Sequence, residues 1–105
     1  MSCNVAGFSH YEGCTVFEEL KVGTPLCLVR EDENVHDHDA IAIFYGDVHL
    51  GYVPARQNSQ LAKLFDLGYG ELFEVYVQSL DPTEYPEDQV RVGIFLKSNP
   101  TVNIH

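Results

Sequence analysis

The chain has 105 residues, of which 45% are hydrophobic and 21% charged, and its formal net charge is −10. This length suits one domain with a single core and is too short for two. No apolar run approaches the roughly 18 residues that a membrane span needs, so we expect no membrane partner and a cytoplasmic location. The acidic charge repels polyanions at long range and disfavours tight non-specific binding to DNA.

Cysteine spacing and the absence of catalytic motifs narrow the class of protein further. Cys3, Cys14 and Cys27 are widely spaced and form no C-x-x-C pair, so we expect reduced thiols, with Cys27 buried in an apolar strand. The sequence has no glycine-rich phosphate loop, nucleophile elbow or H-E-x-x-H motif. We therefore expect a protein that is not an enzyme.

Six segments have the composition of β-strands and are separated by turn residues. They lie at residues 4–10, 26–29, 40–45, 49–53, 72–77 and 90–97. Gly46 and Asp47 predict a hairpin between the third and fourth strands. Pro54 ends the fourth strand because proline cannot donate to a ladder.

One helix is predicted, from a cap at Asn58 or Ser59 through Leu67, with Gly68 as the residue that terminates it. So few helices do not allow the repeated crossovers of a parallel α/β fold. The predicted fold class is mainly β, an OB-like or SH3-like, partly open β-barrel of about six strands with one α-helix. We expect a single domain over residues 1–105, with a core at about 4–98 and a short C-terminal tail at 99–105.

The loop at residues 31–39 concentrates five acids and two histidines before an apolar run. Imidazole and carboxylate groups suit zinc, nickel or manganese, and an extended segment would place His36 and His38 on one face. A third ligand is missing unless His10 or Cys14 folds nearby. The preferred interpretation is a solvated loop and no cofactor, with zinc at His36/His38 as the alternative.

Four blocks of the sequence resemble, in order and spacing, those of the HIRAN domain family. They are V-A-G-F at residues 5–8, V-G-x-x-L-x-L-V-R-E at 22–31, N-x-x-D-x-x-A-I-A at 34–42 and L-G-Y-V-P at 50–54. The resemblance implies an OB-like barrel, found alone in bacterial proteins or joined to helicase, translocase or nuclease modules in DNA repair proteins. In the eukaryotic branch the family captures the 3′ end of single-stranded DNA, with aromatic rings on the terminal bases and a carboxylate on the terminal hydroxyl.

The resemblance also assigns roles to residues by motif position. Asp37 would be the carboxylate, and His36 and Tyr52 would occupy aromatic positions. His10 and Tyr11 would supply aromatic contacts at the end of the first strand. The alternative for Asp37 is an Asx turn that fixes the loop, and for each tyrosine a place at the edge of the barrel core.

Two positions depart from the DNA-binding members of that family. Those proteins carry a basic residue where this chain has Ser9 and Ala55, with Arg56 one step further along. Arg56 and Lys63, near the start of the predicted helix, are the best local phosphate partners. The resemblance thus implies a small module that binds single-stranded DNA or another nucleic acid in DNA repair or processing. The alternative is an interaction or adaptor domain that has lost DNA binding, whose acidic loops at 31–39 and 81–88 contact a basic protein.

Overall fold

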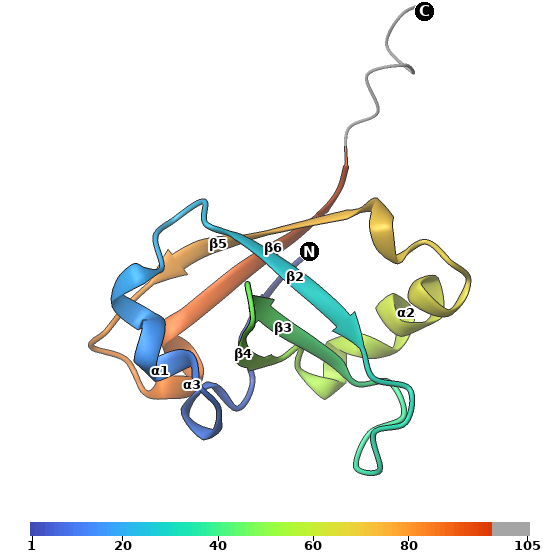
Figure 1. Ribbon diagram of the computed structural model, residues 1–105, viewed down its shortest axis with the longest axis horizontal. Coiled ribbons are helices and arrows are strands. Elements are labelled where there is room, and N and C mark those ends of the chain that lie inside the picture. The colour runs from blue at the N-terminus through green and yellow to red at the C-terminus, as the bar shows by residue number, and fades with distance from the viewer. Residues whose placement is uncertain (98–105) are drawn as a thin grey trace, which may run out of the picture.

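Six antiparallel strands form one curled sheet in the computed structural model, which describes residues 1–97 (Figure 1). The strands are β1 (Ser2–Asn4), β2 (Pro25–Arg30), β3 (Ile41–Tyr45), β4 (Val48–Tyr52), β5 (Phe73–Leu80) and β6 (Val90–Leu96), and the helices are α1 (Gly13–Val16), α2 (Ala55–Asp66) and α3 (Pro86–Gln89). The strand order is β1-β6-β5-β2-β3-β4. Ala6, just after β1, bridges to Tyr52 at the end of β4. This bridge brings the two edges of the sheet together, so the predicted mainly β, partly open barrel is confirmed.

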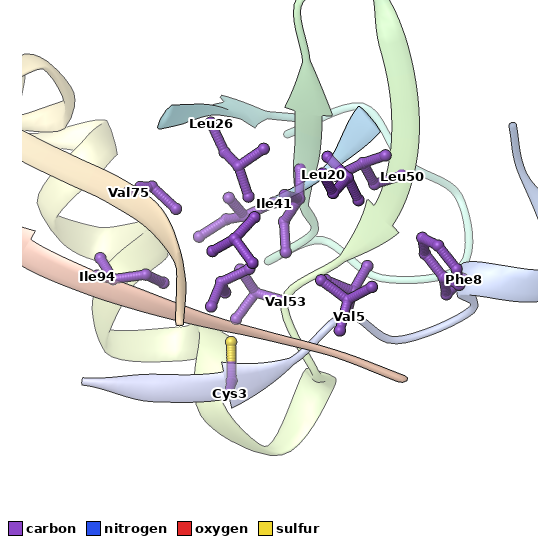
Figure 2. Close-up of a cluster of buried hydrophobic side chains, with 14 of the residues drawn as sticks. Cys3, Val5, Phe8, Leu20, Leu26, Ile41, Leu50, Val53, Val75 and Ile94 are labelled. Atoms are coloured by element: carbon purple, nitrogen blue, oxygen red, sulfur yellow. The ribbon is translucent and has the colours of Figure 1, made fainter. Parts of the chain in front are cut away.

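The core lies inside the curl of the sheet and is covered at one side by α2 (Figure 2). Strand alternation creates it: on β5 the side chains of Val75 and Val77 are buried, while Gln78 is exposed. Burying each such aliphatic side chain contributes about 1.5–3 kcal/mol. The buried residues labelled in Figure 2 come from elements far apart in sequence, namely Cys3, Val5, Phe8, Leu20, Leu26, Ile41, Leu50, Val53, Val75 and Ile94.

The first strand is shorter and earlier than the prediction of residues 4–10. β1 ends at Asn4, and a 3-10 turn follows at Phe8–His10. The reason is Gly7, whose φ of 72° is left-handed and ends the extended course. The turn directs Phe8 into the core, where its ring meets Phe17 edge-on at 6.1 Å between centroids.

α2 also begins earlier than predicted, and the proposed caps at Asn58 and Ser59 are wrong. Pro54 is the residue before the helix, with φ −54°, and no side chain caps it. Asn58 instead lies within the helix on its buried face, three residues before Leu61. The C-terminal prediction is correct, because Gly68 adopts φ 92° and donates its N–H to the Phe65 carbonyl at 3.0 Å. No helix within residues 1–97 is long and apolar enough to cross a membrane.

The prediction that Cys27 is buried is wrong. Cys27 is exposed because Leu26 and Leu28 take the inward positions of β2, and successive side chains on a strand alternate. Cys14 is exposed too, whereas Cys3 is 1% exposed. The predicted tail at residues 99–105, and residue 98 of the predicted core, lie outside the described residues.

Burial raises the pKa of the Cys3 thiol, although the positive charge of Arg91 acts in the opposite direction. We therefore expect an alkylating reagent at mildly alkaline pH to modify Cys14 and Cys27 in the native protein and to reach Cys3 only after unfolding. Mass spectrometry of the native and denatured protein measures this. Rapid modification of Cys3 in the native state would contradict the burial that the structure gives it.

Candidate nucleic-acid interface

Two side-chain turns bend the loop between β2 and β3. The Asn34 Oδ1 atom accepts hydrogen bonds from the backbone N–H groups of His36 at 2.9 Å and Asp37 at 3.2 Å. One step later, the Asp37 Oδ1 atom accepts the N–H of Asp39 at 2.9 Å. Asn and Asp favour such turns because their short side chains reach the backbone two residues ahead. The Asx-turn alternative for Asp37 is therefore observed, and it leaves the second carboxylate oxygen for other partners.

The second oxygen of Asp37 is tied to α2. Asn58 donates from Nδ2 to Asp37 Oδ2 at 2.8 Å, and Asn58 is only 2% exposed. The charged acceptor makes this a stronger hydrogen bond than a neutral pair. Asp37 is thus fixed between its own loop and the helix, with part of its surface still open to solvent.

Sequence reasoning missed Asn58, although a signal was present. Asn58 precedes Leu61 by three residues and Ala62 by four, so it shares their face of α2. A polar residue on a buried helical face needs a partner. Its interpretation as a helix cap concealed this requirement.

An aromatic cluster lies beside the loop. Tyr11 and Tyr52 meet edge-on, with centroids 5.6 Å apart, and Tyr11 also lies 4.3 Å from the His49 ring. Phe44 stacks on the other side of His49 at 4.9 Å. His49 was not among the residues predicted for the site, but the hairpin register places it directly opposite Phe44.

Glu31 fixes the phenol of Tyr52. The Tyr52 hydroxyl donates to Glu31 Oε1 at 2.7 Å, and Asn34 donates from Nδ2 to the same oxygen at 3.1 Å. Burial, and then the hydrogen bond and negative charge of Glu31, hold the pKa of Tyr52 well above its usual range. Tyr52 is therefore a neutral ring with a fixed orientation at physiological pH.

Some of these groups line a cavity of about 330 Å³ that is open to solvent. Four of the residues selected from the sequence line it, namely Tyr11, His36, Asp37 and Tyr52. The apolar part of its lining comes from Ala6, Ala40, Val53 and Ala55. His10 and Arg56 are exposed and do not line the cavity, although Arg56 directly follows Ala55 at the start of α2.

The loop does not have the extended course on which the alternative of zinc at His36/His38 depended. Both histidines are exposed on a bent loop. Over the described part of the chain, no three side chains of His, Cys, Asp or Glu lie together in a way that would hold a metal ion.

The positive charge nearest the loop is already engaged. Arg30 makes two hydrogen bonds to the carboxylate of Asp66, at 3.1 and 3.2 Å, and lies 3.9 Å from Asp39. This bidentate pair connects β2 to the end of α2. Arg30 thus supports the scaffold of the cavity, and Arg56 is the cation beside it that no ion pair within residues 1–97 engages.

Comparisons with known proteins agree with this fold. The sequence model of the HIRAN domain matches residues 1–98. A protein from Lactobacillus plantarum, known from a crystal structure, is similar with a TM-score of 0.76 and 25% identity, over 89% of this chain and 87% of that one. The crystal structure of the HIRAN domain of human HLTF gives a TM-score of 0.66 and 17% identity, over 90% of this chain and 71% of that one, and shows the shared fold. No curated protein matches the chain.

The fold is a curled, OB-like half-barrel. Its pocket lies between the β2–β3 loop, the turn after β1 and strand β4, and this arrangement defines a small binding domain. The chain belongs to the HIRAN family. Within this family the HIRAN domain is known as a DNA-binding module.

Proposed function

We propose that this chain is a non-catalytic module that binds the 3′ end of single-stranded DNA during DNA repair or processing. The observation that carries the proposal is the fixed carboxylate of Asp37, which lines the same cavity as Tyr11 and Tyr52. The cavity is about 330 Å³, within the range of pockets that hold small ligands.

The chemistry of Asp37 favours a free hydroxyl at the end of the strand. An ionised carboxylate only accepts hydrogen bonds, and each of its oxygens here has one protein donor. Each oxygen therefore has remaining capacity for a second donor such as a 3′-hydroxyl. A 3′-phosphate offers further acceptors and negative charge, so the same carboxylate repels it.

The aromatic residues supply the sequence-independent part of the interaction. Stacking of a base on an aromatic ring contributes about 1–3 kcal/mol and tolerates every base. Tyr52 is held by Glu31 and Tyr11 is exposed, so their faces suit the terminal nucleotides. His36 lines the cavity, and the exposed His10 remains a predicted contact on the adjoining turn.

Few cations are placed to hold the phosphates. Ala55 at the N-terminus of α2 lines the cavity and Arg56 directly follows it, and both a helix N-terminus and a cation attract phosphate. With a net charge of −10, further phosphate contacts would be repelled. We therefore propose that the DNA is recognised through its 3′-hydroxyl and through base stacking. The affinity should then depend only weakly on salt concentration.

The variant Asp37→Asn tests the proposal. The amide keeps an acceptor for the Asp39 N–H but removes the charge, so we expect the preference for a 3′-hydroxyl over a 3′-phosphate to fall by about tenfold, equivalent to about 1.4 kcal/mol for a charge-assisted hydrogen bond. Fluorescence anisotropy with short oligonucleotides that differ only at the 3′ end measures the ratio across a salt series.

The matched control is Asp47→Asn, which removes one charge from the exposed turn between β3 and β4. It should leave the ratio unchanged. Equal loss of both ligands in Asp37→Asn, or no binding by the wild type even at low salt, would reject this function.

A further inference from the structure

The barrel is split between β2 and β5. These strands pair only at Pro25 opposite Tyr76 and Leu26 opposite Val75. Beyond Leu26, β2 continues to Arg30 in its ladder with β3, and Figure 1 shows its C-terminal half diverging from β5. Within residues 1–97, no strand pairs with the β5-facing edge of residues 27–30.

A cleft of about 430 Å³ occupies this split. Its apolar floor comes from inward-facing residues of the two strands, namely Leu26, Leu28, Phe73 and Val75. Its rim comes from outward-facing residues, among them the exposed Cys27. The cleft thus offers two rows of contacts, one apolar and one polar, as an added strand with alternating side chains requires.

The rim is predominantly acidic. Glu71 is exposed at the end of the cleft, and Glu74 accepts a hydrogen bond from the Tyr76 hydroxyl at 2.8 Å. Among the residues within 1–97 that line the cleft, Lys97 is the single cation. The remaining charge of the chain, with sixteen acids against six Lys and Arg, adds to this negative potential.

We propose that the split between β2 and β5 binds an extended basic peptide as an additional strand. Its backbone would pair with the open edge of residues 27–30, its apolar side chains would lie on Leu28 and Phe73, and its Lys or Arg side chains would face Glu71 and Glu74. This is recognition by strand addition, in which backbone hydrogen bonds give affinity and alternate side chains give specificity.

The cleft is separate from the candidate DNA site. The two cavities share no lining residue. The two carboxylates on the rim disfavour a phosphate backbone at this position and favour a cationic one. The proposal therefore does not depend on DNA binding.

The test uses a peptide of about six residues with alternating valine and lysine, the length of an ordinary strand. Titration of the isotopically labelled protein, followed by amide chemical shifts, should perturb residues 27–30 and 73–76, and amide exchange along β2 should slow. The double variant Glu71→Gln/Glu74→Gln should weaken binding about threefold to tenfold, as expected for the loss of two partly exposed ion pairs.

A matched variant removes the same charge elsewhere. Asp32→Asn/Glu33→Gln changes two exposed acids of the β2–β3 loop, outside the cleft, and should leave peptide affinity within twofold of the wild type. Shifts confined to the β2–β3 loop, equal weakening by both double variants, or perturbation of the cleft by an oligonucleotide instead of the peptide would overturn the proposal.

Discussion

Replacing Gly51 by alanine is expected to destabilise the protein by about 3 kcal/mol or more, because strain and overpacking act at one position. Gly51 has φ 156°, and a Cβ atom there would overlap the carbonyl oxygen of Ala6 and lie 2.6 Å from a methyl group of Val5. Ala6 and the neighbouring Tyr52 exchange both backbone hydrogen bonds, at 2.8 and 2.9 Å. The substitution must separate these segments, so oligonucleotide affinity should fall as well. Urea denaturation and fluorescence anisotropy measure the two losses.

The matched control is Gly46→Ala in the turn between β3 and β4. Gly46 has φ 56°, and nothing lies within 4 Å of a Cβ atom built on it. Its cost is therefore the left-handed backbone alone, about 1 kcal/mol. Equal destabilisation by the two substitutions would show that backbone conformation, and not the approach of Ala6, sets the requirement for glycine at position 51.

The parts of the fold that local patterns determine could be predicted from the sequence. Strand alternation located β5 and β6, and Gly46 with Asp47 located the hairpin. Gly68 ends α2 because only its left-handed conformation allows the last carbonyl groups to find donors. In each case the determining interactions join residues a few positions apart.

The candidate site was predicted only in part because the contacts that hold it together join residues far apart in the sequence. The motif pattern selected Asp37 and Tyr52, but not the residues that fix them, Asn58 and Glu31. Asn58 lies 21 positions from Asp37, and local reasoning assigned it the commoner role of a helix cap. The course of the loop is a related case, since the turns made by Asn34 and Asp37 bend a segment that composition alone treats as extended.

These anchors explain how four segments form one pocket. Ala6 attaches the segment after β1 to β4, Glu31 attaches the loop to Tyr52, and Asn58 attaches the same loop to α2. Each anchor fixes a group that lines the cavity, so a ligand meets side chains whose conformational freedom has already been lost. Such preorganisation lowers the entropic cost of binding, which would favour the proposed recognition of a DNA end.

Replacing Asn58 by aspartate is expected to have the other large effect. The Asn58 amide lies 2.8 Å from Asp37 Oδ2 at a position that is 2% exposed, so the variant places a buried carboxylate in contact with the partly exposed carboxylate of Asp37. We expect a loss of about 3–5 kcal/mol at neutral pH, typical of an uncompensated buried charge. The dipole of α2 favours an acid near this end by less than about 1 kcal/mol and does not offset the loss.

The pH dependence identifies the cause. The neighbouring carboxylate of Asp37 raises the pKa of the introduced acid in the folded state. At pH values above the ordinary carboxyl pKa, the folded variant therefore binds more protons than the unfolded chain. Stability of Asn58→Asp should therefore rise as pH falls from neutral toward 5, whereas the deficit of Asn58→Ala should stay constant over the same window. If the free energies of unfolding of these two variants changed with pH in the same way, the contact between positions 37 and 58 would be contradicted.

Exchanging the side chains of Asp37 and Asn58 distinguishes a role in supporting the loop from a role in recognising the end of the strand. In Asp37→Asn/Asn58→Asp, the amide at position 37 donates to the carboxylate at 58 while its oxygen still accepts the Asp39 N–H, so the hydrogen bond returns with its direction reversed. We expect the exchange to recover more than half of the stability lost in Asn58→Asp. It moves the charge out of the cavity wall into α2, so the preference for a 3′-hydroxyl should remain as low as in Asp37→Asn. Recovery of stability together with that preference would show that the carboxylate of Asp37 supports the loop and takes no direct part in recognising the end of the strand.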